Sequence, residues 1–131
     1  MKLITFIVSL ALSAPAAALD ISGFESMMSQ RSSADLEEAR AARLMLTAYF
    51  AGVAELLSTQ SAPSQAIYFH GKKAACFPRG ATISGPVFMA LVESELRDPT
   101  KIREVLGSSW RTYSVTTVLF FSLLKNYPCP D

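Results

Sequence analysis

The chain has 131 residues, half of them hydrophobic, with 12 basic and 11 acidic side chains, two cysteines and one histidine. This length accommodates one domain and excludes a two-domain protein. A formal charge of +1 gives the chain no electrostatic reason to bind nucleic acid or an anionic membrane surface. The mean hydropathy of +0.29 is high for a small soluble protein, and part of the apolar excess lies at the start of the chain.

Residues 1–18 have the pattern of a secretory signal peptide. Lys2 supplies the positive n-region, an apolar stretch follows it, and small residues precede a cleavage point between Ala18 and Leu19. The apolar stretch is shorter than the roughly 20 residues of a membrane-spanning helix, so we expect cleavage rather than a retained anchor. Cleavage would leave residues 19–131 as one domain without stable membrane insertion, and loss of Lys2 would leave 11 basic and 11 acidic side chains.

The only two cysteines are Cys76 and Cys129. In an exported protein, a lone pair of cysteines forms a disulfide more often than a metal site or a nucleophile. A bond between them would close 52 intervening residues, which corresponds to about 4 kcal/mol of stabilisation through loop-closure entropy. We therefore expect an intramolecular disulfide, with intermolecular pairing or free thiols as the alternatives.

The first part of the exported chain is predicted to be helical. Residues 19–31 are mixed in character and allow a short helix over 23–30. A longer helix is predicted over 34–57, because Ser32 or Ser33 can cap it and acidic side chains in its first turn face the positive end of the helix dipole. Large apolar side chains in its second half recur at helical spacing and form one stripe, which consists of Leu46, Tyr49, Phe50, Val53, Leu56 and Leu57.

Two small residues, Ala48 and Gly52, lie one turn apart on this helix. A glycine inside a helix costs about 1 kcal/mol relative to alanine, so its presence calls for an explanation. Small side chains let another backbone approach closely. The close approach is either tight packing within the monomer or a helix crossing at a homodimer interface.

Residues 58–79 break the helical pattern. We expect a loop that contains a short extended stretch at 66–69, followed by a polar, basic loop at 70–73. His70 has no second ligand at a metal-like spacing, so neither a metal site nor a cofactor is predicted. Its imidazole is either a solvated loop side chain or a contact residue for an acidic or polar partner surface.

Three further helices are expected in the last part of the chain. The first is capped by Ile83 or Ser84 and ends at Arg97, and the second occupies 98–107. The run at 112–125 contains residues that also suit a strand, but its length favours a buried helix. Together these elements predict an all-α, single-domain helical bundle of four to five helices closed by one disulfide.

Recognisable catalytic motifs are missing from the sequence. It contains no HExxH, no CxxC and no glycine-rich phosphate loop, and the expected disulfide would consume both thiols. A serine–histidine arrangement would have to use His70, without a serine elbow. We therefore predict a binding or structural protein rather than an enzyme.

Four short segments in this order resemble the Rap/Tai family of immunity proteins. They are YFAGV at 49–53, CFPRGAT at 76–82, DP at 98–99 and YPC at 127–129. The resemblance implies an all-helical fold, an equivalent disulfide, frequently a homodimer, and neutralisation in the periplasm of a toxin delivered by type VI secretion. The chain departs from the family pattern because it lacks a further cysteine near the first segment and has a longer segment at 107–113.

The resemblance further implies how such a protein acts. The characterised targets are amidases that cut peptidoglycan peptides, and a loop or helix end of the immunity protein blocks the amidase cleft. Two loops, at 60–73 and 107–113, offer residue types enriched at interface hot spots. The alternatives are that Trp110 is a core residue and that Lys72 and Lys73 are solvated charges. The toxin-contact candidates are Tyr68, His70, Lys72 and Lys73 in the first loop, and Trp110 and Arg111 in the second.

Two other functions fit an exported helical protein with one disulfide. One is a small periplasmic holdase chaperone of the acid-stress type, which would unfold or dissociate as its carboxylates are protonated. The other is an adaptor of an envelope assembly. The single histidine and the modest acidic content give the holdase little support.

Overall fold

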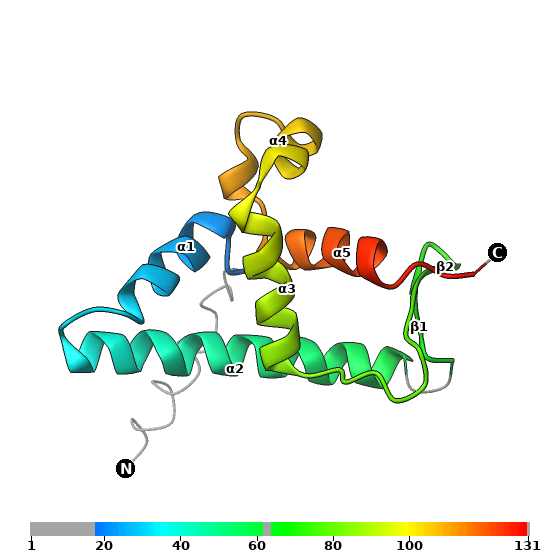
Figure 1. Ribbon diagram of the computed structural model, residues 1–131, viewed down its shortest axis with the longest axis horizontal. Helices are drawn as coiled ribbons and strands as arrows, with labels where there is room; N and C mark the ends of the chain where they lie inside the picture. Colours follow the sequence, from blue (N-terminus) through cyan, green and yellow to red (C-terminus); the bar gives the residue numbers. More distant parts are fainter. Residues whose placement is uncertain (1–17, 62–63, 131) are drawn as a thin grey trace, which may run out of the picture.

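The computed structural model describes residues 18–61 and 64–130 (Figure 1). The predicted signal peptide lies outside the described residues, except for Ala18. The elements in chain order are α1 (Ile21–Gln30), α2 (Leu36–Ser61), β1 (Ala66–Phe69), β2 (Lys72–Cys76), α3 (Gly85–Arg97), α4 (Thr100–Leu106), the 3₁₀ helix η2 (Trp110–Thr112) and α5 (Val115–Asn126).

The long helix α2 organises the fold. Helix α1 packs against α2, and α3 packs against both α2 and α5, crossing them in Figure 1. The segment before α1 pairs with the segment before α5, because the Val115 amide donates to the Leu19 carbonyl (2.9 Å) and the Ile21 amide donates to the Tyr113 carbonyl (3.0 Å). This pairing joins the start of the described chain to the segment between η2 and α5.

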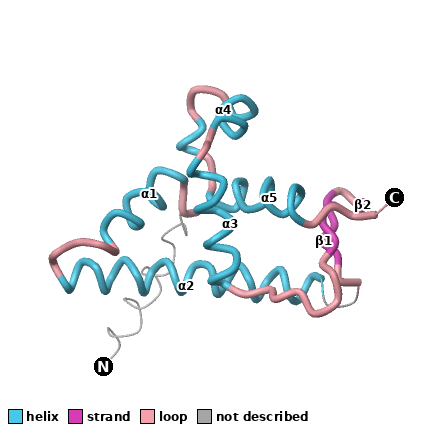
Figure 2. Tube along the Cα trace, viewed as in Figure 1, coloured by secondary structure: helices cyan, strands magenta, loops and turns pink. Residues whose placement is uncertain are grey.

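The prediction of an all-α fold is wrong. The fold is mostly helical, but β1 and β2 form a two-stranded antiparallel sheet, drawn in magenta in Figure 2. The strands are joined by His70 and Gly71, whose φ angles are 49° and 76°. Positive φ at both central residues is the geometry of a two-residue hairpin turn that matches the twist of the strands. The predicted loop at 70–73 is therefore the tip of a β-hairpin.

Helix α2 starts later than predicted, and a different residue caps it. The Asp35 carboxylate accepts hydrogen bonds from the amides of Glu37 (2.9 Å) and Glu38 (3.2 Å), whereas the Ser33 hydroxyl accepts only from the Asp35 amide.

By length and composition alone, α2 is apolar enough to cross a membrane. One side of it is buried through Leu46 and other core residues, as expected of the central helix of a globular domain, but Leu56 of the predicted stripe is 59% exposed.

Helix α3 approaches the backbone of α2 closely at Gly85, the first residue of α3. A Cβ atom at this position would lie 3.0 Å from the backbone of Phe50 and Ala51. Ser84, one of the two predicted caps, occupies the N-cap position of α3 without a side-chain hydrogen bond, and the helix ends at Arg97 as predicted. Gly85 thus lets the start of α3 rest directly on the backbone of α2.

The core lies where α1, α2, α3 and α5 meet. Phe24 and Phe50 pack edge to face with ring centroids 5.9 Å apart, and Phe88 and Val92 are fully buried on α3. The predicted apolar run at 112–125 forms α5, a helix rather than a strand, with Val115, Val118, Leu119 and Leu123 in the core.

Candidate functional site

The hairpin of β1 and β2 stands at one end of the molecule, beside the C-terminus (Figure 1). It brings four of the predicted contact residues together and adds Phe69. All five side chains are exposed. We call these five residues the hairpin tip: Tyr68, Phe69, His70, Lys72 and Lys73.

The register of the hairpin determines which tip residues are neighbours. Phe69 pairs with Lys72 and Tyr68 pairs with Lys73. Paired side chains lie on the same face of a sheet, so each face of the tip carries one aromatic ring and one ammonium group. The register shifts between Ile67 and Tyr68, which marks a bulge at the point where the hairpin leaves the buried part of the molecule.

Aromatic contacts hold the tip against α5. The Phe69 ring lies 5.3 Å from the Phe120 ring and 4.4 Å from the His70 ring, measured between centroids. Sequence reasoning missed Phe69 because a phenylalanine in a short extended stretch is typically a core residue. The signal that identifies it is its place directly before the two-residue turn.

The base of the hairpin is fixed covalently and by hydrogen bonds. Cys76 and Cys129 form the predicted disulfide, and the Cys76 amide donates to the Tyr127 carbonyl (2.8 Å). The Phe77 amide donates to the Gln65 carbonyl (2.7 Å), and the Phe77 and Tyr127 rings lie 5.0 Å apart. A disulfide of this kind forms and persists in an oxidising compartment.

The second predicted contact region lies elsewhere. Trp110 is only 4% exposed and belongs to the core. The Arg111 guanidinium stacks 4.3 Å above the Trp110 ring, and its Nε lies 2.9 Å from a carboxylate oxygen of Glu25. In Figure 1 this region adjoins α1, away from the hairpin. The structure therefore does not join Trp110 and Arg111 to the hairpin tip in one surface.

Ala48 and Gly52 lie on an exposed side of α2. Among the residues that the structure describes, no atom beyond the helix itself would come within 4 Å of a Cβ placed on Gly52, so neither α1 nor α3 packs there. Tight packing within the monomer, one of the two explanations offered for these residues, occurs at Gly85 instead.

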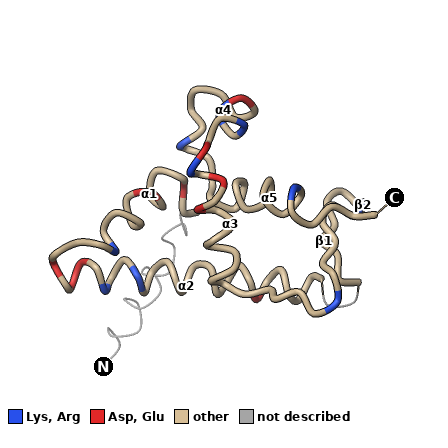
Figure 3. The backbone as a smooth tube through the Cα atoms, in the orientation of Figure 1, with Lys and Arg blue, Asp and Glu red and all other residues tan. Residues whose placement is uncertain are grey.

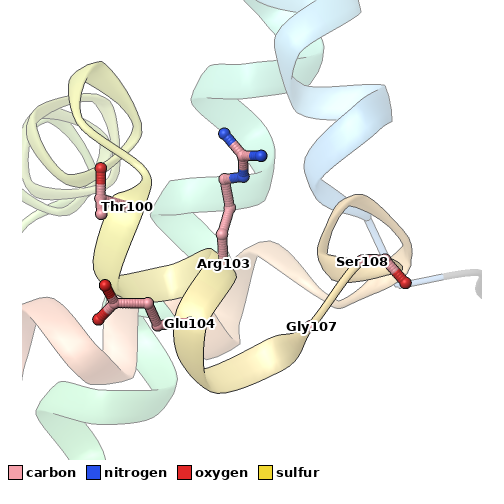
Figure 4. Close-up of a pocket in the computed structure, with 5 residues that line it drawn as sticks. All are labelled: Thr100, Arg103, Glu104, Gly107 and Ser108. Atoms are coloured by element: carbon pink, nitrogen blue, oxygen red, sulfur yellow. The ribbon is translucent and has the colours of Figure 1, made fainter.

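Another candidate site is an open cavity of about 450 Å³ at α4 (Figure 4). Arg103 and Glu104 contribute opposite charges, and their side chains point in different directions. Among residues 18–61 and 64–130, no group of three His, Cys, Asp or Glu side chains is placed to hold a metal ion. The hairpin tip is therefore the better defined site.

Comparisons with known proteins do not identify the chain. No protein-family model, curated protein or solved structure matches it. The hairpin tip is consequently interpreted from its own geometry and residue types.

Proposed function

We propose that the protein is an exported immunity protein that binds a cognate toxin in the periplasm and blocks its active-site cleft with the hairpin tip. The observation that carries this proposal is the exposed aromatic and basic tip on a hairpin whose base is closed by a disulfide. The assignment of the toxin as a peptidoglycan amidase delivered by type VI secretion follows from the sequence resemblance.

The rigidity of the hairpin supports an inhibitory role. A loop that already has its bound conformation loses less entropy on association than a flexible one. Here the turn at His70 and Gly71, the contact between the tilted Phe69 and Phe120 rings and the Cys76–Cys129 bond all restrict the hairpin. A narrow, convex tip is also the shape that enters a concave cleft.

The side chains of the tip support a particular kind of target surface. Tyr68 offers a large surface and a hydroxyl, a combination enriched at binding hot spots. Lys72 and Lys73 are exposed, and neither takes part in the three ion pairs of the described residues. The tip is therefore complementary to a cleft with an apolar wall and an acidic rim.

Co-purification tests the proposal. The exported protein, carrying an affinity tag, is expressed together with the product of the gene that adjoins its own gene. The amount of that product retained with the tagged protein is then measured. Cells that receive the same product in the periplasm are then scored for survival. We expect retention and survival with the wild-type protein.

A matched pair of variants localises the contact. Lys72→Glu/Lys73→Glu reverses two charges at the tip, and Lys101→Glu/Arg103→Glu reverses two exposed charges on α4. The tip variant should lose retention and protection, and the α4 variant should keep both. Equal protection by the two variants, or no protection by the wild type, contradicts the proposal. Suppression of acid-induced client aggregation without protection would favour the holdase instead.

A further inference from the structure

An apolar groove lies between α2, α5 and β1, next to the hairpin tip. It is a cavity of about 300 Å³, and Thr116 is the only polar residue among the eight described residues that line it. Its walls include Val53 and Leu56 of α2, Ile67 of β1, and Leu119 and Phe120 of α5. In Figure 1 the ends of α2 and α5 adjoin the hairpin. We call this cavity the apolar groove.

The apolar groove is open to water but offers it few partners. An ordered water needs about two to four polar partners, and the Thr116 hydroxyl is already hydrogen-bonded to the Ser114 hydroxyl (2.7 Å). Two large apolar side chains beside the groove are exposed: Leu56 is 59% exposed and Phe69, whose ring contacts Phe120, is 56% exposed. Exposed apolar surface around a concavity marks an interaction site. An apolar ligand would displace weakly held water and cover both side chains.

Positive charge adjoins the apolar groove at the hairpin. Lys72 pairs with Phe69, so the two side chains lie on the same face of the hairpin, which is the face that contacts Phe120. Lys73 is the next residue along β2, and its side chain therefore lies on the opposite face. Lys72 is exposed and takes part in none of the three ion pairs of the described residues. Its ammonium group is thus available to an anion at the mouth of the groove.

Acidic side chains are missing from two of the three elements that form the groove. All residues of β1 and α5 are described, and neither element contains Asp or Glu. The acidic side chains, red in Figure 3, belong to the other helices and to the segments beside them. On the α2 wall, Glu55 precedes Leu56 and is exposed. An anionic group is therefore favoured at the hairpin end of the groove and disfavoured beside α2.

We propose that the apolar groove binds a fatty acid, with the acyl chain between α2 and α5 and the carboxylate beside Lys72. The volume of about 300 Å³ is at the small end of the range for ligand pockets, which favours one acyl chain over the two chains of a phospholipid. The proposal goes beyond the proposed function and does not depend on it, because it concerns a small molecule rather than a toxin.

Calorimetric titration with dodecanoate, kept below the concentration at which it forms micelles, tests the groove. The exported, disulfide-bonded protein should bind one dodecanoate per chain. Leu56→Glu adds a carboxylate that an acyl chain would bury without a partner, so it should weaken binding about tenfold or more. Leu44→Glu is the matched control, because Leu44 is 61% exposed on the same helix and does not line the groove, and it should bind like the wild type.

Circular dichroism checks that both leucine variants are folded. A wild-type protein that does not bind dodecanoate overturns the proposal. Equal dodecanoate affinities of Leu56→Glu and Leu44→Glu also overturn it, because the ligand would then lie outside the groove.

A pair of lysine variants and a second probe locate the carboxylate. Lys72→Gln should weaken dodecanoate binding about fivefold, whereas Lys73→Gln, on the opposite face of the hairpin, should leave it unchanged. Dodecanol has the same chain without the carboxylate, and its affinity should be equal for the wild type and Lys72→Gln. Equal dodecanoate affinities of the two lysine variants, or dodecanoate that binds no more tightly than dodecanol, overturn the position of the carboxylate.

NMR locates the ligand without any substitution. Addition of dodecanoate to isotope-labelled wild-type protein should shift the amide signals of Leu57, Ile67 and Phe120 in the groove. The signals of Arg103 and Glu104, at the separate cavity on α4, should not move. Shifts at α4 that spare the groove overturn the proposal. No toxin is present in these experiments, so their outcome does not depend on the immunity function.

Discussion

Cys76, the last residue of β2, is bonded to Cys129, which follows α5. The amide of Cys76 also donates to the carbonyl of Tyr127, two residues before Cys129. The covalent bond and the hydrogen bond connect the same two segments. The base of the hairpin and the C-terminal segment therefore behave as one unit, and α3, α4 and α5 all lie within the closed loop.

Removal of this disulfide should destabilise the whole domain. We expect Cys76→Ser/Cys129→Ser to lower the free energy of unfolding by about 4 kcal/mol, because the unfolded chain regains the entropy of an open loop. Urea denaturation measures the loss. Wild-type protein denatured in the presence of a reductant is the control and should behave like the double variant. An unchanged denaturation midpoint after reduction would contradict the role given to the bond.

The glycines of α2 and α3 should respond in opposite directions to alanine. Gly85→Ala introduces a Cβ 3.0 Å from the backbone of Phe50 and Ala51, which cannot move aside as a flexible side chain can, so we expect a loss of about 1–3 kcal/mol. Gly52→Ala meets open space and should gain about 0.5–1 kcal/mol through helix propensity. Urea denaturation at one protein concentration compares them. A destabilising Gly52→Ala would show that this position is packed.

The helices were predictable because their signals are local. Ser84 and Pro86 mark the start of α3, and Asp98–Pro99 marks its end. The extended stretch predicted at 66–69 forms β1, but its pairing with β2 was missed. The strands have only four and five residues, and the exposed half of each strand lies next to the turn rather than alternating with the buried half. A histidine before Gly71 is also a less familiar turn signal than asparagine. Contacts distant in the sequence, such as the disulfide, help to hold the strands in place.

The candidate site was also predicted in part: most of its hairpin residues were identified, but the burial of Trp110 was not. Tyr68, His70 and the two lysines are close in the sequence, so a short hairpin is enough to bring them together. The burial of Trp110 depends on how η2 packs against α1, and the Arg111–Glu25 pair spans 86 residues of sequence. No local pattern determines such a contact, so the choice between a core tryptophan and an interface tryptophan needed the fold.

Trp110 and Arg111 are adjacent in sequence but should differ in their effect on stability. Trp110→Ala removes a buried ring and should cost about 3–5 kcal/mol. Arg111→Ala removes an exposed ion pair and a stacking contact and should cost at most about 1 kcal/mol. Thermal unfolding followed by circular dichroism compares the two. Equal losses would show that Trp110 contributes through its contact with Arg111 rather than through burial.

Asp98 should make a pH-dependent contribution to stability at the start of α4. The Thr100 hydroxyl donates to its carboxylate (2.6 Å), as does the Thr100 amide (3.3 Å), and these bonds lower the pKa of Asp98. The pKa of Asp98 in the folded protein lies below its value of about 4 in the unfolded chain. Its stabilising contribution is therefore present above about pH 4 and is lost as the pH falls through the folded pKa.

Replacement of the hydroxyl donor tests this contribution. We expect Thr100→Val to raise the pKa of Asp98 in an NMR titration and to lower the melting temperature near neutral pH, with the difference from wild type shrinking in acid. Thr59→Val is the matched control, because the Thr59 hydroxyl donates to the backbone carbonyl of Glu55 and not to a carboxylate. Its effect on the melting temperature should not depend on pH in this range. Identical Asp98 titrations in the wild type and in Thr100→Val would refute the assignment, because the hydroxyl supplies the largest part of the pKa shift.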